Sequence, residues 1–483
     1  MKPLRVFLVN VGIRTFNSYW LVPPMGILAL ATYLRGKLDA DFLLANQRLD
    51  NCTSAELGRR ADGFEADVVG LSAMTAHAYL LNPIIRAVRA VRPNALIVIG
   101  GAHASALGVL ALDSIEADAA VLGEGEITFE RLIHARFDGG DLSTIPGLVW
   151  RADDGTVTAN PGAPEPIEDL DMLPMPAYDL IDLPKYWHHQ TMAPIFWRKY
   201  ISLLTSRGCP YQCIFCHNIF GKRIRNHSAE RVVEEMTWFH RQYGVRDFEI
   251  IDDTFNLDGG RVIRISDLLR SHGLRFKLTI PNGIRADILR QEHVDALADA
   301  GLYQCSIALE SGSPRIQKFI QKNIHIPRFL RAVEMMEQRR IFMHTYCMQG
   351  FPTETEEELQ QTIDVACEAK THTTSFFTVT PFPGTPLYDM VLARHPEKVR
   401  GLSLDQATLI TVNVNLTDLP DPVFYAYKRK AFRQYYFDAR RIARILRDHP
   451  QPWSLPLYAP LLAYRLLRRT PFVRLAVPDS DRT

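Results

Sequence analysis

The sequence predicts an α/β protein in three parts: an N-terminal doubly wound, Rossmann-like sheet, a central partial (β/α)6 barrel and a mainly helical C-terminal region. Two observations lead to this fold class. Short apolar runs alternate with helical patterns before residue 160, and six further run-and-helix units follow between residues 198 and 390. The length of 483 residues also suits about three units of roughly 150 residues each.

The N-terminal part, residues 1–160, carries five apolar runs of strand length, at 6–9, 42–45, 68–72, 96–99 and 119–122. The stretches 26–37, 54–64, 80–91 and 104–114 have helix-like apolar spacing. Strands that alternate with helices of this length predict a parallel sheet with helices on both faces. Such a sheet binds ligands at the carboxyl ends of its strands.

Candidate ligand-binding residues follow three of these strands. They are Ser72, Thr75, Gly100, Gly101, His103, Gly123 and Glu124. Glycines let the backbone approach a ligand closely, and serine and threonine hydroxyls can donate or accept hydrogen bonds. A flavodoxin-like sheet with ordinary tight turns is the alternative explanation for this pattern.

A hairpin is predicted at residues 147–160, around Asp154-Gly155. The next segment, 161–197, is rich in proline and acidic residues but also contains Tyr178, Tyr186 and Trp187. Because large aromatic side chains are unusual in a free tether, we expect an ordered linker that packs across both neighbouring parts.

The central part, residues 198–390, has strand patterns at 201–205, 248–251, 276–280, 304–309, 343–348 and 375–379. Helical patterns between them lie at 230–243, 262–271, 294–300, 328–338 and 356–368. Six β/α units are too few for an eightfold barrel but suit a partial one. The active site of such a barrel is expected at the carboxyl ends of its strands, where the segments are polar or glycine-rich.

Three cysteines, Cys209, Cys213 and Cys216, follow the first of these strands with the spacing C-x3-C-x2-C. Three thiolates can wrap one face of a cubane iron-sulfur cluster and leave its fourth iron open, whereas a structural zinc site needs a fourth ligand. A zinc site completed by His217 and a set of unrelated thiols are the two alternatives. The remaining cysteines stand singly and are expected to be small buried side chains: Cys52, Cys305, Cys347 and Cys367.

The composition indicates which binding partners and which cellular compartment to expect. The net charge of +1 predicts no general attraction to nucleic acid. The first residues show no signal-peptide pattern, and no run of about 18 uncharged apolar residues occurs. We therefore expect a cytoplasmic protein with reduced thiols.

The C-terminal part, residues 391–483, is expected to be a helical domain. One long helical pattern runs from Asp421 to Arg447 and is strongly basic. The stretch from Leu455 to Leu467 is apolar but short, and basic residues follow it. A solvated basic face on a substrate-capping domain is one interpretation, and a peripheral contact with a membrane interface is the other.

The cysteine spacing, with Phe215 directly before the last cysteine, resembles the radical S-adenosylmethionine (SAM) superfamily. The resemblance implies that SAM chelates the open iron through its amino and carboxylate groups. It implies that reductive cleavage of SAM then gives a 5′-deoxyadenosyl radical. A reductant such as flavodoxin or ferredoxin is implied as a partner.

The order of motifs after the later strands resembles the same superfamily and implies a SAM site. Asp252 or Asp253 would accept the SAM ammonium, and Arg285 would lie near the SAM carboxylate. Glu310 and Ser311 would bind the ribose, while Gly350 and Phe351 would place the adenine. For any single carboxylate, a helix cap or loop anchor is the alternative role.

The candidate residues of the N-terminal part, together with residues 23–26 and 381–388, resemble the cobalamin-binding branch of the superfamily, the class B methylases. In that branch the serine motif and the double glycine face the nucleotide tail of cobalamin. Some cobalamin domains ligate cobalt through Asp-x-His-x-x-Gly, but residues 11–17 contain no histidine. We therefore expect cobalamin to bind without a histidine from that loop.

The resemblance implies three cofactors: a [4Fe-4S] cluster, SAM and cobalamin. It implies an enzyme that methylates an unactivated carbon of a small-molecule or lipid metabolite, through the 5′-deoxyadenosyl radical and methylcobalamin. One alternative is a radical SAM cyclase or rearrangement enzyme that uses cobalamin without methyl transfer. Another is a non-catalytic cobalamin or redox sensor.

Overall fold

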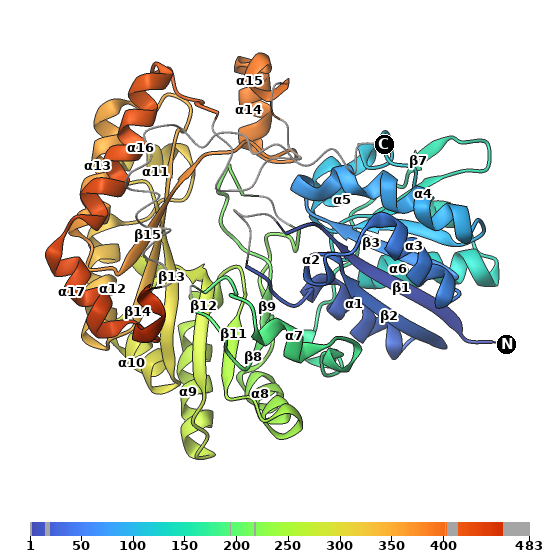
Figure 1. Ribbon diagram of the computed structural model, residues 1–483, viewed down its shortest axis with the longest axis horizontal. Coiled ribbons are helices and arrows are strands. Elements are labelled where there is room, and N and C mark those ends of the chain that lie inside the picture. The colour runs from blue at the N-terminus through green and yellow to red at the C-terminus, as the bar shows by residue number, and fades with distance from the viewer. Residues whose placement is uncertain are drawn as a thin grey trace.

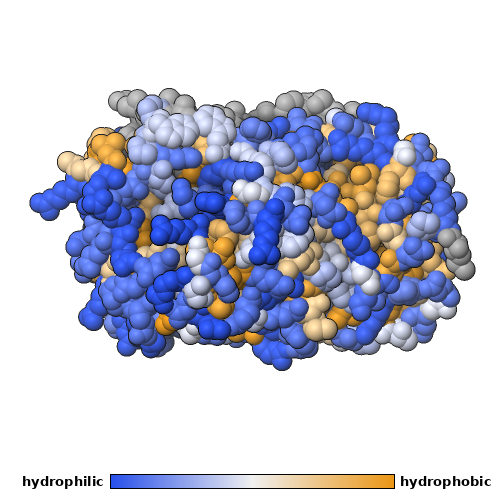
Figure 2. Space-filling view, turned by 90° about the horizontal axis from the view of Figure 1, so that it is seen from below, coloured by the Kyte–Doolittle hydropathy of each residue, from blue (hydrophilic) through white to orange (hydrophobic). Residues whose placement is uncertain are grey.

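The computed structural model describes residues 2–14, 20–193, 195–216, 219–400, 402 and 414–456. Two α/β units stand side by side, one built on the N-terminal sheet and one on the curved central sheet (Figure 1). Within the described ranges, no helix is both long and apolar enough to cross a membrane. The face seen from below is mostly hydrophilic, with apolar residues in scattered patches (Figure 2).

The N-terminal sheet has seven strands in the order β2-β1-β3-β4-β5-β6-β7. They are β1 (Leu4–Val11), β2 (Ala40–Asn46), β3 (Val68–Ala73), β4 (Leu96–Gly100), β5 (Ala119–Val121), β6 (Leu148–Arg151) and β7 (Val157–Ala159). The first five pair in parallel, and β6 and β7 add the predicted antiparallel hairpin. The order 2-1-3-4-5 is that of a doubly wound sheet, which confirms the predicted fold class.

Helices cover both faces of this sheet. They are α1 (Met25–Arg35), α2 (Gln47–Asp50), α3 (Ser54–Gly63), α4 (Leu81–Val91), α5 (Ala102–Leu107) and α6 (Glu126–Asp138). Side chains alternate along β1, so Val6 and Leu8 pack with α1 and α6, while Phe7 and Val9 pack with α3 and α4. The predicted helix 104–114 is shorter than expected, because α5 ends before Gly108, whose φ is +57°.

The central sheet has six parallel strands in chain order, β8-β11-β12-β13-β14-β15. They are β8 (Tyr200–Leu203), β11 (Asp247–Ile250), β12 (Lys277–Ile284), β13 (Leu302–Glu310), β14 (Phe342–Gln349) and β15 (Thr373–Thr378). The helices outside it are α8 (Ala229–Tyr243), α9 (Gly259–Ser271), α10 (Gln291–Asp299), α11 (Pro314–Phe319), α12 (Ile326–Gln338) and α13 (Glu356–Glu368). Because β8 and β15 do not pair, the barrel is partial, as predicted.

The C-terminal helices are α14 (Pro386–Arg394), α15 (Pro396–Arg400), α16 (Asp421–Tyr436) and α17 (Ala439–Asp448). The first two stand near the top of the view, and α16 and α17 lie on the outer side of the barrel, where α16 contacts β15 (Figure 1). The hydroxyl of Tyr436 bonds both the amide and the carbonyl of Thr374, which occupies backbone groups that an edge strand would expose. The single long helix predicted for 421–447 is wrong, because the chain breaks after Tyr436 and Asp438 caps a second helix.

The linker between the sheets packs against both units and contains the short helix α7 (Leu183–Trp187). The buried Tyr178 donates a hydrogen bond to the carbonyl of Ser202 in β8, at 2.5 Å, and the amide of Ala177 bonds Thr32 of α1. Trp187 donates to the carbonyl of Tyr200 at 2.8 Å. These contacts hold the two units together, while the exact domain limits at 160, 197 and 390 stay a prediction.

One buried carboxylate also joins the units. Glu124, which follows β5, accepts hydrogen bonds from Arg207 at 2.8 Å and from Arg225 at 3.1 Å. Arg207 pairs in addition with Glu126 at 2.8 Å, and all four side chains are buried. Arg207 lies in β9 (Ser206–Arg207) and Arg225 in β10 (Arg225–Asn226), a two-stranded ribbon of the second unit.

Replacing Glu124 by alanine should destabilise the protein by about 3–5 kcal/mol, because it leaves Arg225 buried without a carboxylate. Urea denaturation of the purified chain measures this change in the free energy of unfolding. Glu165→Ala, which removes an exposed partner of Arg131, is the matched control and should have little effect. Equal losses in the two variants would contradict a buried ionic contact between the units.

Candidate functional site

The cysteine loop, residues 208–224, lies beyond the carboxyl end of β8. It begins after β9 and ends at β10, and these two short strands pair as a ribbon. Its first residue, Gly208, has a φ of +91°, and a Cβ there would collide with the carbonyl of Arg223. The amide of Cys209 bonds the carbonyl of Gly221 at 3.2 Å, and the amide of Cys216 bonds the carbonyl of Cys213 at 3.2 Å. These bonds tie together the described residues of the loop.

The three thiols lie on one loop and differ in exposure. Cys209 and Cys213 are partly exposed, and Cys216 is exposed. Burial raises the pKa of Cys213. Protons are held tightly here unless a metal replaces them, and three neighbouring thiols on one loop suit three irons of a cubane. His217, the fourth zinc ligand of the alternative hypothesis, lies outside the described residues.

No group of three metal-binding side chains is assembled at ligand distance in the described part of the chain. The assignment of Cys209, Cys213 and Cys216 as cluster ligands therefore rests on their spacing and shared position. The donor set fits a cluster, since all three donors are thiols and the barrel mouth contributes cationic side chains around them.

Two cationic side chains lie beside the cysteine loop. Arg285 stacks on the ring of Tyr211 at 3.9 Å, donates to the carbonyl of Lys322 at 2.9 Å and pairs with Asp287 at 3.0 Å. Lys322 Nζ lies 2.7 Å from Glu310 Oε1. The guanidinium of Arg285 is thus paired within the protein, and its predicted contact with the SAM carboxylate stays a prediction.

Two predicted SAM ligands are occupied by contacts within the protein. Asp252 is fully buried and accepts hydrogen bonds from the amide and hydroxyl of Thr205, both at 2.6 Å, and from Ser206 at 2.7 Å. Ser311 is also fully buried, 3.2 Å from Thr362 Oγ1, and accepts from the amide of Ser313. These contacts use the side chains within the protein, and the predicted roles of Asp252 with the SAM ammonium and of Ser311 with the ribose stay predictions.

The neighbouring candidates remain accessible. Asp253 is exposed and precedes Thr254, whose hydroxyl lies 3.6 Å from Cys209 Sγ, so it lies near the cysteine loop. Of the two acidic candidates for the SAM ammonium, only Asp253 keeps an accessible carboxylate. Glu310 stays the candidate for the ribose, with one carboxylate oxygen held by Lys322.

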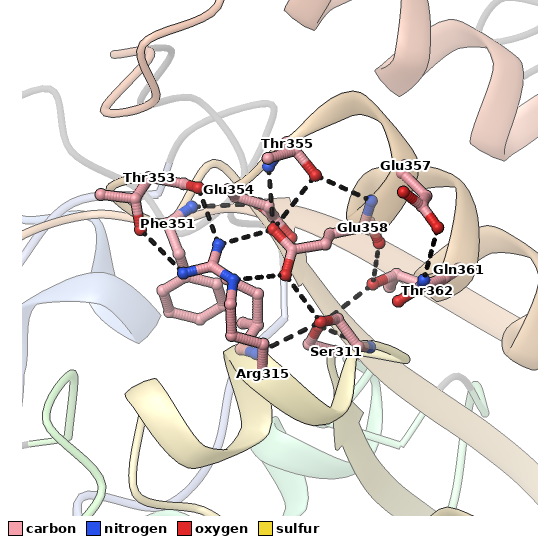
Figure 3. Close-up of polar contacts among 12 residues, drawn as sticks. Ser311, Arg315, Phe351, Thr353, Glu354, Thr355, Glu357, Glu358, Gln361 and Thr362 are labelled. Atoms are coloured by element: carbon pink, nitrogen blue, oxygen red, sulfur yellow. Dashed lines mark hydrogen bonds and ion pairs between the residues drawn. The ribbon is translucent and has the colours of Figure 1, made fainter.

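The turn after β14 is organised by a buried carboxylate that the sequence argument missed. Glu354 is 2% exposed and accepts hydrogen bonds from the amides of Gly350 at 2.7 Å and Phe351 at 3.1 Å (Figure 3). Because both amides are used, an adenine contact would have to use other atoms of Gly350 and Phe351. The ring of Phe351 lies 5.9 Å from that of Phe215, which ties this turn to the cysteine loop.

The carboxyl edge of the first sheet gathers most of the predicted cobalamin residues. Ser72 pairs in register with Gly100 across β3 and β4. Gly101 has a φ of +84°, and a Cβ there would lie 2.6 Å from Ser72 Oγ, so this close approach requires glycine. The hydroxyl of Ser105 links the two turns by donating to the carbonyl of Gly101 and accepting from the amide of Gly123.

The other predicted cobalamin residues differ in their surroundings. Thr75 begins a short 3-10 helix (Thr75–Leu80) after β3, and His103 is buried in α5. Burial lowers the pKa of His103, so its imidazole is neutral at pH 7. Glu124 pairs with Arg207 and Arg225 between the units, and its assignment as a cofactor ligand stays a prediction.

The loop after β1 also meets a histidine from a neighbouring segment. A Cβ at Gly12 would lie 2.8 Å from His77 and 2.9 Å from Arg48, so these side chains close over the loop. Burial lowers the pKa of His77 to about 4, and the charge of Arg48 adds to the decrease. The expectation that cobalamin binds without a histidine from this loop stays a prediction.

The Glu354→Gln variant should show a weaker dependence of stability on pH than the wild type. Burial raises the pKa of Glu354 to about 8 from an ordinary 4.5, so its contribution to stability is complete below about pH 4.5 and is lost as the pH rises towards 8. Glutamine keeps an oxygen for the two amides but does not ionise. Thermal unfolding midpoints at about pH 6 and about pH 8.5 measure the difference.

The matched control is Glu357→Gln, an exposed carboxyl at the start of α13. It should keep the pH dependence of the wild type. A Glu354→Gln profile that also matched the wild type would contradict a proton held at Glu354.

Two family patterns match this chain. The pattern described as the radical SAM superfamily matches residues 203–366, which contain the cysteine loop. The pattern described as the B12 binding domain matches residues 13–133, which contain Ser72, Gly101 and Glu124. An uncharacterised methyltransferase of Pyrococcus horikoshii is 30% identical over 428 residues, which is 88% of this chain and 86% of the relative.

An anaerobic magnesium-protoporphyrin IX monomethyl ester cyclase of Rubrivivax gelatinosus is 26% identical over 431 residues, 86% of this chain and 75% of the relative. The solved structure of the cobalamin-dependent SAM radical enzyme OxsB, with aqua-cobalamin and SAM bound, superposes with a TM-score of 0.74 at 16% identity. That match covers 96% of this chain and 71% of the other, and shows a shared fold. The chain therefore belongs to the cobalamin-binding branch of the radical SAM superfamily, whose cofactors are a [4Fe-4S] cluster, SAM and cobalamin.

Proposed function

We propose that this protein is a cobalamin-dependent radical SAM methyltransferase that acts on an unactivated carbon of a small-molecule or lipid metabolite. One observation carries the proposal. The cysteine loop is fixed by Arg207 and Arg225 to Glu124, at the carboxyl edge of the first sheet. This contact supports a cluster site close to the proposed cobalamin site, as a substrate that meets both cofactors requires.

When bound, the cluster with SAM supplies a hydrogen-abstracting radical, and cobalamin supplies the methyl group. The chain's own residues orient these groups. Cys209, Cys213 and Cys216 hold the cluster and leave one iron for SAM, while Asp253 accepts the SAM ammonium. An sp3 carbon needs this chemistry because it has no lone pair for ordinary methyl transfer.

Two matching glycine turns support the proposed cobalamin site. Ser72 and Gly101 touch closely at the ends of β3 and β4, and Gly123 follows β5 beside them. Together with Gly100 and Thr75 they form a surface of small side chains, which leaves room for the nucleotide tail of cobalamin. His103, neutral and buried beside this surface, completes the proposed site.

A cyclase that uses both cofactors without methyl transfer is the second candidate, and the similarity to the magnesium-protoporphyrin cyclase favours it. The products separate the two. Methylation yields S-adenosylhomocysteine from one SAM and 5′-deoxyadenosine from another, whereas cyclisation yields no S-adenosylhomocysteine. A one-electron reductant such as flavodoxin or ferredoxin is the proposed partner in both cases.

A peripheral membrane contact is proposed for the C-terminal helices. Phe437, Ile442 and Leu446 are exposed next to arginines of α17. An apolar stripe with basic neighbours suits an interface with anionic lipid. Most of the apolar stretch predicted from Leu455 lies outside the described residues.

The Cys213→Ser variant should lose the cluster and with it all SAM cleavage, since a cubane held by two thiolates lacks a ligand for its third iron. Anaerobic reconstitution with iron and sulfide, followed by SAM and dithionite, is the assay, read by iron content and by mass spectrometry of 5′-deoxyadenosine and S-adenosylhomocysteine. The matched control is Cys367→Ser on α13, which should keep both. Zinc in place of iron, or deoxyadenosine from Cys213→Ser, would overturn the proposal.

A further inference from the structure

A buried ion pair between Lys322 and Glu310 stands beside the cysteine loop. Lys322 Nζ lies 2.7 Å from Glu310 Oε1, and the side chains are 14% and 9% exposed. Glu310 is the last residue of β13 and has a φ of +61°, a left-handed conformation that is unfavourable for glutamate. Backbone strain of this kind is kept only where the surroundings hold it, and it concentrates at functional sites.

The segment that carries Lys322 also has an unusual backbone conformation, which side-chain hydrogen bonds hold in place. Its neighbours Gln321 and Asn323 both have left-handed φ values, +55° and +53°. The side chain of the buried Gln317 spans this segment: it donates to the carbonyls of Leu309 at 2.7 Å and Ser311 at 2.6 Å, and it accepts from Ile324 at 3.0 Å. These bonds hold the lysine against the carboxyl end of β13.

The segment of Lys322 is bonded to the cysteine loop. The amide of Ile214, which follows Cys213, donates to the carbonyl of Ile320 at 3.1 Å. Arg285 stacks on the ring of Tyr211 and donates to the carbonyl of Lys322 at 2.9 Å. Burial disfavours the charged lysine, but the charge of Glu310 opposes that effect and the pKa of Lys322 is raised, so the side chain is protonated.

We propose that Lys322 is a positioning residue that holds Glu310 in its strained conformation and places one buried positive charge against the cluster thiolates. This inference rests on the proposed cluster at Cys209, Cys213 and Cys216. Three thiolates bring three negative charges into a partly buried site, where a nearby cation is weakly screened. The cation stabilises the reduced cluster, which carries one more negative charge than the oxidised cluster.

The test is a charge series measured on SAM-free, reconstituted protein, with the one-electron midpoint potential of the cluster as the readout. Lys322→Met leaves a net charge of −1 at the pair, Glu310→Gln leaves +1, and the double variant restores zero. The potential should be lowest in Lys322→Met, highest in Glu310→Gln, and alike in the wild type and the double variant. Lys322→Arg should match the wild type.

The expected step for Lys322→Met is at least a tenfold shift of the reduction equilibrium towards the oxidised cluster, or about 59 mV for one electron. Breaking a buried pair can also prevent folding. If Lys322→Met does not fold, two other variants still test the proposal. The double variant removes both charges and should keep the wild-type potential. Glu310→Gln removes only the negative charge and should raise the potential.

The matched control is Arg315→Gln, which removes one positive charge from the Arg315–Glu358 pair between α11 and α13 (Figure 3). It should leave the potential unchanged. Equal potentials across loaded Lys322 and Glu310 variants would overturn this inference alone, and so would a shift of the same size in Arg315→Gln. A wild type that takes up no cluster would overturn the cluster assignment and this inference with it.

Discussion

Arg207 and Arg225 stand at the two ends of the cysteine loop, and both reach across to Glu124 on the other unit. This ion cluster is buried, so its charges are attractive in a low-dielectric setting and would be costly if separated. The loop cannot move away from the first sheet without exposing or unpairing these charges. The relative position of the two cofactor sites therefore depends on this contact.

Charged side chains at the mouth of the barrel are also paired within the protein. Asp252 accepts hydrogen bonds from Thr205 and Ser206 directly before the cysteine loop, so it helps to fix the start of the loop. The guanidinium of Arg285 stacks on the ring of Tyr211 in the cysteine loop. Buried ionisable groups here are nearly all matched within the protein, which leaves Asp253 as the exposed carboxylate of the acidic pair.

The C-terminal helices have a structural role besides any role in substrate binding. Lys428 and Tyr436 of α16 bond the backbone of β15, the last strand of the partial barrel. An open barrel otherwise leaves a strand edge that can pair with another chain. Helix α16 therefore covers part of the edge of β15.

Local features of the sequence determined the strands, most helices and the cysteine loop, because apolar periodicity and ligand spacing are set by neighbours along the chain. Ser72, Gly100 and Gly101 could be grouped in advance, since parallel strands end at one edge. Only the tertiary structure decided which polar residues are free. Asp252 and Asp253 are adjacent and chemically alike, and Thr205 and Ser206 decide between them. Glu354 and Lys322 could not be singled out, because their roles depend on contacts formed only in the folded barrel.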